Sequence, residues 1–577
     1  MDQSLLKFQI GPVQDFIAQA RSTRDLWSGS FLLSWLMAHA VKSVIARQGS
    51  DALVFPSVSD QPLLKWLEKP QSEPQIPAAL TPNLPNLCVA LLPTSEREAT
   101  DLARHLEEVI RAEWRRIAET CWTSVATGSD FAAKPLAHAS QKARFGRQIE
   151  QFLSVSWQVT PWTENYADTN RRNAWQLDAV RQTRNFQAWA PGGWTAGVLS
   201  NKDSLTGREE AICGGTAWWN ACIKGDAELE HFFPGRHAGE FYGAITLVKR
   251  LWPRVCKPCG RDAIQALPIP STWQVANHDP DKNESSQDSQ APAGGAYFAV
   301  LAMDGDEMGK WISAEKRELK CEAGEHRAFS ARLSEFALKH AARTVREHDG
   351  LLIYAGGDDV LALLPADAAL QCAKALRDKF REVLKLPGID ASAGIAIAHC
   401  MEPLQDVVKA AGAAVHRAKD EHHRRAVAVT LLKRSAGSVE WGCRWDEGGL
   451  ELHAAFARAL REKRLSGKAP YRLVEVVTPY LSQPTPLLVE RAAVGDARDF
   501  GRDLNEILGR ELDIILDRHR AGDVSLPELH GQLRPHLDNY LKHFPEGAIS
   551  AKLKAIIGLC EIVAFFDKPS FAKGQPA

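Results

Sequence analysis

Apolar and polar positions alternate near the start of the chain in a pattern that predicts a first group of strands and helices. Short apolar runs predict strands at 4–10, 52–56 and 87–92. Apolar residues at helical spacing predict an amphipathic helix over 28–47, whose first residue is a serine suited to N-capping. A long charged helix follows from about 95 to 121.

The second half of the chain repeats this order more completely. Strand, helix, hairpin, helix and strand signals follow one another, and a further helix and strand come behind them. Their ranges are 296–304, 328–347, 350–364, 366–385, 391–398, 404–419 and 425–433. Two helices against a mainly antiparallel sheet in this order are typical of a ferredoxin-like palm. From about 445 onward the pattern is helical.

A short string of residues occurs in both halves. The segment 88–93 (CVALLP) is echoed by 360–365 (VLALLP), and each copy follows an apolar strand and precedes a helix. The first half has Ile-Gly-Pro at 10–12 where the second has Asp-Gly-Asp at 304–306. We interpret this as a duplicated palm in which only the second copy is acidic, although a string this short also arises by chance.

These patterns predict an α+β protein with two ferredoxin-like palm domains, a mixed middle domain and a C-terminal helical domain. The predicted boundaries are 1–150 for a degenerate palm, 151–290 for the middle domain, 291–437 for the acidic palm and 438–577 for the helical domain. Seven tryptophans gather between positions 157 and 219 in the middle domain, and a polar, acidic linker follows at 276–294.

Composition narrows the class of protein. The chain has 577 residues, which gives a prior of about four domains, and its net charge is −1. Near-neutrality excludes a polycation that holds nucleic acid by bulk charge, so any such contact has to be local or shared with partner chains. We see no leader peptide and no apolar run of about 18 residues, so we expect no membrane contact. Eleven scattered cysteines then indicate a reducing, cytoplasmic setting.

The candidate chemistry lies in the acidic palm. Asp304 ends its first strand, and Asp358 and Asp359 form the turn of the hairpin. The first strand of this fold is central and lies next to the third, so the three carboxylates should meet at one end of the sheet. Hard oxygen ligands of this kind suit Mg²⁺ or Mn²⁺ together with a nucleoside triphosphate such as ATP. Two such ions lower the barrier for attack of a 3′-hydroxyl on an α-phosphate. The alternative is a tight turn with solvated aspartates.

Further residues around the carboxylates are candidates for binding the triphosphate. Glycines allow backbone amides to approach phosphates closely, and a lysine at a helix end neutralises phosphate charge. For the lysine, the alternative is a solvated side chain that complements the helix dipole. The candidates are Gly305, Asp306, Gly356, Gly357 and Lys419.

Weaker motifs lie elsewhere. Cys256 and Cys259 form a CxxC knuckle, but a zinc site needs two more ligands, and Cys213, Cys222 and His278 are badly spaced for that role. A vestigial, unliganded pair is the favoured alternative. We attribute the His-Asp dipeptides at 278–279 and 348–349 to chance, and we place the pair at 422–423 on the solvated surface.

Several motifs resemble the large polymerase–cyclase subunit of type III-B (Cmr-type) CRISPR–Cas effector complexes. The resemblance covers residues 4 to about 440, and the helical remainder fits only by position. The matching segments are IGPVQDFIAQARSTRDLWSGSFLLSWL (10–36), PSTWQVA (270–276), MDGDEMGKW (303–311), YAGGDDVLALLP (354–365) and AVAVTLLKRSAG (426–437).

The resemblance implies a function. Members of that family convert ATP into cyclic oligoadenylates when their complex, which holds a guide crRNA and other Cmr-type subunits, binds target RNA. Asp304, Asp358 and Asp359 then fall on the metal-binding positions. Because the chain starts at the first palm, we expect no HD nuclease activity. Three alternatives remain open, namely AMP transfer to S-adenosylmethionine, a non-catalytic scaffold and a stand-alone cyclase that makes cyclic dinucleotides.

Overall fold

The structure is a computed structural model. It describes residues 2–566 with the exception of 69–75, 127–138, 184–200, 226, 234–237, 256–268, 280–296, 313–319, 435–436, 483–496, 523 and 546–547. The Cys256–Cys259 knuckle and most of the predicted acidic linker lie outside the described residues.

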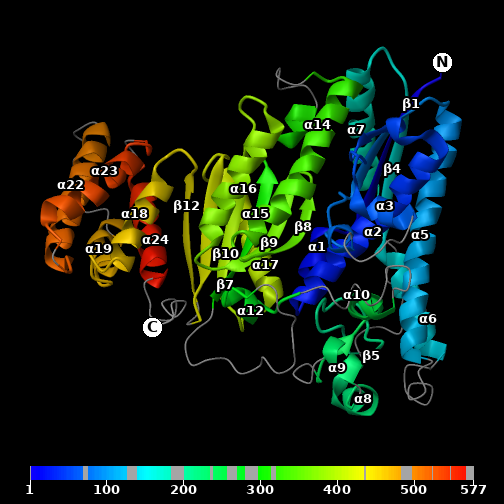
Figure 1. Cartoon of the computed structure of the whole chain (residues 1–577), viewed down its shortest axis with the longest axis horizontal. Coiled ribbons are helices and arrows are strands. Elements are labelled where there is room, and N and C mark those ends of the chain that lie inside the picture. The colour runs from blue at the N-terminus through cyan, green and yellow to red at the C-terminus, as the bar shows by residue number, and fades with distance from the viewer. Residues whose placement is uncertain are drawn as a thin grey trace.

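The first sheet has four antiparallel strands in the order β2-β3-β1-β4 (Figure 1). This is the ferredoxin-like order that the sequence pattern predicts. Its strands are β1 (Ser4–Gly11), β2 (Leu53–Phe55), β3 (Leu87–Leu92) and β4 (Ser154–Pro161). The helices of this part are α1 (Gln14–Ala18), α2 (Thr23–Gln48), α3 (Pro62–Glu68), α4 (Ile76–Ala79), α5 (Glu96–Ala126), α6 (Ala139–Phe152) and α7 (Tyr166–Gln182).

The second sheet has six strands in the order β12-β11-β10-β7-β9-β8, and only the β10–β11 pair is parallel. Its strands are β7 (Tyr297–Gly305), β8 (Leu351–Gly356), β9 (Asp359–Pro365), β10 (Ala391–His399), β11 (Ala426–Leu432) and β12 (Ser438–Arg444). Its helices are α13 (Met308–Ile312), α14 (Ala323–Glu335), α15 (Ala342–Arg346), α16 (Ala369–Leu384) and α17 (Leu404–Asp420), with a π-helical stretch (Phe336–Ala341) between α14 and α15.

The two sheets share one strand order. When the four core strands of each sheet are numbered by their order in the chain, they lie side by side as fourth, first, third and second in both sheets. In the second sheet, β11 and β12 continue the sheet beyond its fourth core strand, β10. The echoed strings fall on the third strands, β3 and β9, and the Ile-Gly-Pro and Asp-Gly-Asp segments fall at the ends of the first strands, β1 and β7. The predicted pair of palms is confirmed.

Two of the predicted domain boundaries cut through the sheets. β4 pairs with β1 along its whole length, although residues after 150 were assigned to the middle domain. β12 pairs with β11, although residues after 437 were assigned to the helical domain. Sequence patterning missed both placements because strand pairing depends on partners that are distant in the chain.

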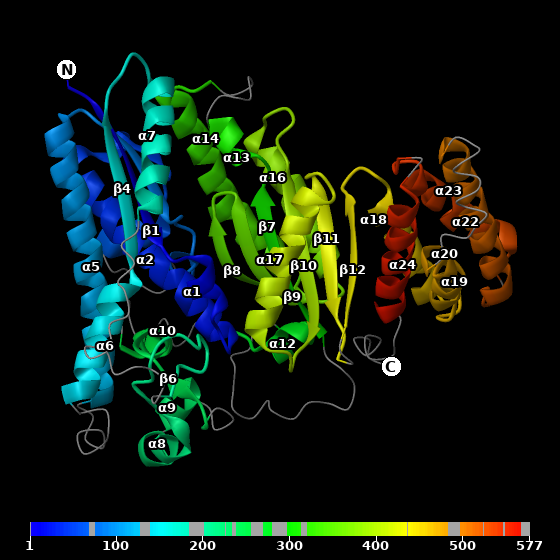
Figure 2. The ribbon, with the colours of Figure 1, turned by 180° about the vertical axis from the view of Figure 1, so that it is seen from behind.

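Helix α2 lies between the two palms (Figure 2). It begins at Thr23, because Ser22 and Asp25 form a capping box, and the predicted N-cap Ser28 lies buried inside the helix. One apolar cluster contains residues of α2 together with Ile353 and Leu363 of the second sheet. By length and composition alone α2 passes as a membrane span, but 72% of its most apolar window is buried, as in the core helix of a globular fold.

A smaller region packs against the first palm. It comprises β5 (Cys213–Gly214), α8 (Gly215–Cys222), α9 (Ala227–Phe232), β6 (Phe241–Tyr242) and α10 (Ala244–Val255). The next helix, α12 (Thr272–Ala276), contacts β7 and β9 of the second palm instead. The buried guanidinium of Arg250 on α10 pairs with Asp25 of α2 at 3.3 Å, and the buried ammonium of Lys249 donates to backbone carbonyls at the end of α1. These paired charges fix the region to the first palm.

The last part of the described chain is helical, as predicted. Its helices are α18 (Gly449–Arg461), α19 (Ala469–Val477), α20 (Pro479–Ser482), α22 (Ala497–His519), α23 (Leu526–Leu541) and α24 (Ile549–Phe566). α24 packs on β12, and its Glu561 pairs with Lys433, which directly follows β11, at 3.1 Å. The bundle therefore lies at the end of the molecule away from the first palm (Figure 1).

His278 links the chain after α12 to the second palm, a contact that the sequence pattern does not reveal. Its Nδ1 lies 2.9 Å from Asp349 Oδ2 and its Nε2 lies 3.0 Å from Asp367 Oδ1. The hydrogen bond to Asp367, followed by the bond to Asp349, raises the pKa of His278 to about 9. The ring is therefore a doubly protonated bridge and not a metal ligand.

We predict that this bridge gives stability that depends on pH. The folded pKa lies above the unfolded value of about 6.5, so the contribution is complete below pH ~6.5 and is lost as pH rises through ~9. Because all three side chains are half-exposed, we expect His278→Gln to cost only about 1 kcal/mol at pH 6 and nothing at pH 10. Thermal unfolding at both pH values measures this, with the exposed His416→Gln as control. Equal shifts at both pH values would contradict it.

Candidate metal and nucleotide site

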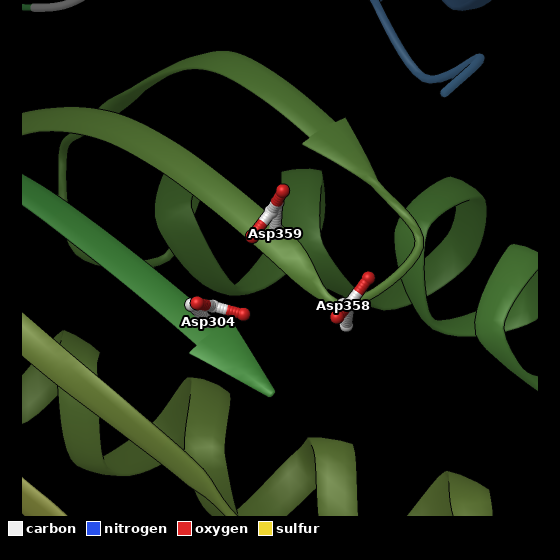
Figure 3. A group of neighbouring side chains, drawn as sticks. All are labelled: Asp304, Asp358 and Asp359. Atoms are coloured by element: carbon white, nitrogen blue, oxygen red, sulfur yellow. The ribbon is translucent and has the colours of Figure 1, made fainter. Parts of the chain in front are cut away.

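Three carboxylates meet at one end of the second sheet. Asp304 lies on β7, Asp358 lies in the turn between β8 and β9, and Asp359 begins β9 (Figure 3). One oxygen from each lies within 4.8 Å of the others. Met303 pairs with Val360, so the register brings Asp304 beside Asp359. This is the convergence that the predicted strand order requires.

Glycines allow this close approach. A Cβ at Gly305 would lie 2.9 Å from Asp358 Cβ and 2.8 Å from Met308 Sδ, so only glycine lets the end of β7 reach the hairpin turn. Gly357 has φ +85°, a conformation that favours glycine. Gly356 lies beneath the Tyr354 ring, where a Cβ would overlap the phenol oxygen. The glycines thus shape the turn, and their predicted contact with phosphates stays a prediction.

We predict that Gly305→Ala lowers any metal-dependent activity of this site. The added methyl pushes the turn away from β7, and a displacement of about 1 Å at a reacting centre costs about a hundredfold in rate. Gly412→Ala on α17 is the matched control, because a Cβ there meets nothing within 4 Å. Rates of both variants, together with their thermal unfolding, check the prediction. A Gly305→Ala variant that keeps its rate and binds metal normally would contradict it.

The protein raises the proton affinity of the hairpin carboxyls. Burial and then the charge of Asp304 raise the pKa of Asp358 to about 7. Burial and the charges of Asp358 and Asp304 also raise the pKa of Asp359. Asp359 is the most exposed of the three, so crowding by like charges is the main cause of its raised pKa. Such a cluster is costly unless a cation lies within it.

The donor set fits a hard divalent cation. All three groups offer carboxylate oxygens, the ligands preferred by Mg²⁺ and Mn²⁺, and soft sulfur or imidazole ligands are missing from the cluster. Among the described residues this is the one group of three or more acidic, histidine or cysteine side chains close enough to share an ion. The predicted metal ligands are therefore brought together.

Lys419 reaches the same cluster. It lies near the end of α17, and its Nζ contacts Asp304 Oδ2. Its side chain is only 16% exposed, so this is not the solvated helix-end lysine of the alternative interpretation. The ammonium places a positive charge next to the carboxylates.

Asp306 does not join the cluster, contrary to its prediction as a nucleotide-binding residue. It is buried, with 5% of its surface exposed, and its two oxygens accept hydrogen bonds from Ser392 Oγ and the Arg425 backbone N–H. Burial raises the pKa of this carboxyl. The prediction grouped Asp306 with Asp304 because the two are close in sequence. The motif does not show how the chain turns after β7.

The first palm supports the acidic hairpin, a role that no motif in the sequence indicates. The Ala355 backbone N–H on β8 donates to the Pro82 carbonyl at 3.0 Å, and Phe55 of β2 lies against Gly357. Arg327 of α14 donates to the Leu53 carbonyl at 3.2 Å. The first palm carries Ile-Gly-Pro at the position of Asp-Gly-Asp, so it backs the site without offering carboxylates there.

The remaining predicted ligands are not gathered in the described part of the chain. Cys213 on β5 and Cys222 at the end of α8 are buried near each other, and burial raises the pKa of Cys213. His278 is bound elsewhere, to Asp349 and Asp367. The zinc prediction for the 256–259 knuckle lies outside the described residues. His422, predicted to be solvated, instead packs over Gly442, and burial lowers its pKa to about 4.

Two family models match the chain. The Cas10/Cmr2 second palm domain covers residues 297–428, and the N-terminal region of the CRISPR-associated protein Cmr2 covers residues 5–119. A curated relative is the CRISPR system Cmr subunit Cmr2 of Pyrococcus furiosus, which is 25% identical over 75% of this chain. The chain spans 62% of that relative's length.

Solved structures agree on the fold. The type III-B Cmr-beta complex in its apo state contains a chain that matches 91% of this one, with a TM-score of 0.65 and 14% identity, and 78% of that chain is covered. The Cmr-beta complex bound to cognate target RNA gives a TM-score of 0.62, also at 14% identity, over 91% of this chain and 79% of the other. The chain is thus similar to Cmr2 proteins in its N-terminal region and to the Cas10/Cmr2 second palm in the region that carries the clustered carboxylates.

Proposed function

We propose that this chain is the nucleotidyltransferase subunit of a cytoplasmic type III-B CRISPR ribonucleoprotein, and that it joins ATP into cyclic oligoadenylates when the complex binds target RNA. The observation that carries the proposal is the convergence of Asp304, Asp358 and Asp359 within 4.8 Å at the strand ends of a Cas10/Cmr2 palm. Other Cmr-type subunits, a guide crRNA and target RNA are the proposed partners. The fold match to Cmr-beta complexes supports them.

The roles of the residues follow from their placement. Asp304, Asp358 and Asp359 would hold the divalent cations, which when bound supply charge stabilisation for the triphosphate and acidify the attacking 3′-hydroxyl. Lys419 would exchange its contact with Asp304 for the negative charge of the triphosphate. Gly305 and Gly357 hold the turn close to β7, so the carboxylates need little rearrangement when a ligand binds.

Product analysis tests the proposal. The assembled complex is incubated with labelled ATP, Mg²⁺ and matching or mismatched RNA, with and without S-adenosylmethionine, and products are identified by mass spectrometry. We expect cyclic adenylates only with matching RNA and Mg²⁺. An adenylated S-adenosylmethionine would support the alternative acceptor, and an assembled complex that forms no product would support the scaffold.

A further inference from the structure

Three hydrogen bonds from two segments, the start of β10 and the turn before β11, hold Asp306 in place. One side-chain oxygen accepts from Ser392 Oγ of β10 at 2.8 Å, and the other accepts from the Arg425 backbone N–H at 2.9 Å. Its own N–H donates to the Asp390 carbonyl at 2.9 Å. With both oxygens occupied and the residue buried, Asp306 has little left to offer a ligand.

The residue that Asp306 holds lies in an unusual turn. His423, Arg424 and Arg425, between α17 and β11, have φ of 58°, 65° and 51°, a region that side chains with a Cβ rarely occupy in succession. Such a turn persists only when its surroundings fix it. Arg425 is tied by the bond to Asp306, by its own Nη2 to the Gly388 carbonyl at 3.0 Å, and by its carbonyl to the Trp445 N–H at 2.9 Å.

This turn directly follows the helix end that carries Lys419. α17 ends at Asp420, one residue after the lysine whose Nζ contacts Asp304. Asp304 and Asp306, two positions apart at the end of β7, therefore hold the same segment from two sides. Asp304 holds the Lys419 side chain, and Asp306 holds the backbone behind it.

A second set of contacts fixes the Asp390 carbonyl, which accepts the hydrogen bond from the Asp306 backbone N–H. The carboxylate of Asp390 accepts two hydrogen bonds from Arg377 of α16, both at 2.6 Å, so the backbone carbonyl that receives the Asp306 N–H is fixed. The Arg377 guanidinium also lies over the Trp445 ring, 5.8 Å from its centre. The end of β7 is thus anchored in a rigid, fully paired network.

We propose that Asp306 is a positioning residue, which fixes the 421–425 turn so that Lys419 is registered against Asp304 and the metal-binding carboxylates, and that it touches neither metal nor nucleotide. The inference rests on the proposed function, because it assigns a part of the same site. It separates two carboxylates that the Asp-Gly-Asp motif presents as equivalent.

Two substitutions test the proposal in the assembled complex. Asparagine keeps both hydrogen bonds, since its oxygen accepts from the Arg425 N–H and its amide donates to the Ser392 hydroxyl, whose own proton then turns away. We expect Asp306→Asn to keep turnover within about threefold and Asp306→Ala to lose about a hundredfold. If Asp306 were a metal ligand, Asp306→Asn would lose most of its turnover. An Asp306→Asn variant as inactive as Asp358→Asn therefore overturns the proposal.

Two measurements do not depend on activity. Mn²⁺ binding to the purified chain, followed by electron paramagnetic resonance, should be no weaker in Asp306→Ala than in the wild type, whereas loss of a ligand weakens it about tenfold or more. Hydrogen exchange at the Arg425 amide should accelerate in Asp306→Ala and, more weakly, in Ser392→Ala. If the wild-type complex makes no adenylates, the proposed function fails while these measurements still decide the role of Asp306.

A double-mutant cycle separates positioning from general support of the fold. If Asp306 acts through Lys419, Asp306→Ala should reduce turnover much less in a Lys419→Gln background than in the wild type. Equal losses in both backgrounds would overturn the proposal. Should Asp306→Ala not fold, Ser392→Ala enters the same cycle. Asp406→Asn, an exposed substitution on α17, is the matched control.

Discussion

Replacing Asp358 and Asp359 together with asparagine should abolish adenylate formation while leaving the chain folded and assembled. These two groups and Asp304 are the charged oxygens that the site offers to divalent cations, and removal of transition-state charge stabilisation costs about a thousandfold or more. Initial rates of product formation by the assembled complex measure the effect. Asp406→Asn, far from the cluster on α17, is the control and should keep its rate.

The same variant should be more stable than the wild type when metal is absent. In EDTA the wild type keeps three carboxylates within 4.8 Å, and relief of each repulsive pair contributes on the order of 1 kcal/mol. Mg²⁺ should then raise the melting temperature of the wild type and not that of the variant. A variant that melts lower than the wild type in EDTA would mean that these aspartates serve the fold and not a bound ion.

The sequence was most informative where structure depends on neighbours along the chain. The strand predicted at 87–92 has those bounds in the structure, and the hairpin predicted at 350–364 forms β8 and β9. Apolar runs bounded by turn residues encode such elements locally. The order of the strands followed from the helix-and-strand sequence, because few topologies accommodate it. The meeting of Asp304 with the hairpin carboxylates followed in turn.

Sequence patterning failed where a side chain finds a partner from a distant segment. Asp306 looks like a second ligand until Ser392 and Arg425 are placed beside it, and His278 looks isolated until Asp349 and Asp367 fold around it. The helix predicted over 28–47 begins earlier in the structure, at Thr23. Its first turn is buried but polar, so the apolar pattern missed it, and only the capping geometry of Ser22 marks its start. Each error concerns a polar group whose partner a linear pattern does not reveal.

The support of the acidic hairpin by the first palm was also missed, because its two partners are distant in the chain. The contact from Pro82 to Ala355 joins two backbone groups, so no side-chain type in either segment signals it. It nevertheless gives the duplicated palm a physical role in this chain. A copy without carboxylates at the end of its first strand braces the edge of the copy that has them.

Lys419→Gln should change nucleotide and metal binding in opposite directions. Its ammonium contacts Asp304, so its loss removes a cation that competes with a metal ion, and Mn²⁺ alone should bind more tightly. The same loss removes the proposed charge-assisted contact to the triphosphate, worth about 1.5–3 kcal/mol, so the KM for ATP should rise at least about tenfold. Electron paramagnetic resonance of Mn²⁺ and initial rates against ATP concentration measure the two effects.

The opposite signs distinguish this role from a structural one, because a lysine that merely stabilised the fold would weaken both kinds of binding when removed. Lys419→Arg keeps the charge and should restore much of the ATP affinity, although the bulkier fork does not reproduce the contact with Asp304. Lys409→Gln, an exposed position on the same helix, should change neither quantity. If Mn²⁺ binds more weakly to Lys419→Gln, the lysine instead organises the carboxylates for the ion, and its contact with Asp304 persists when metal is bound.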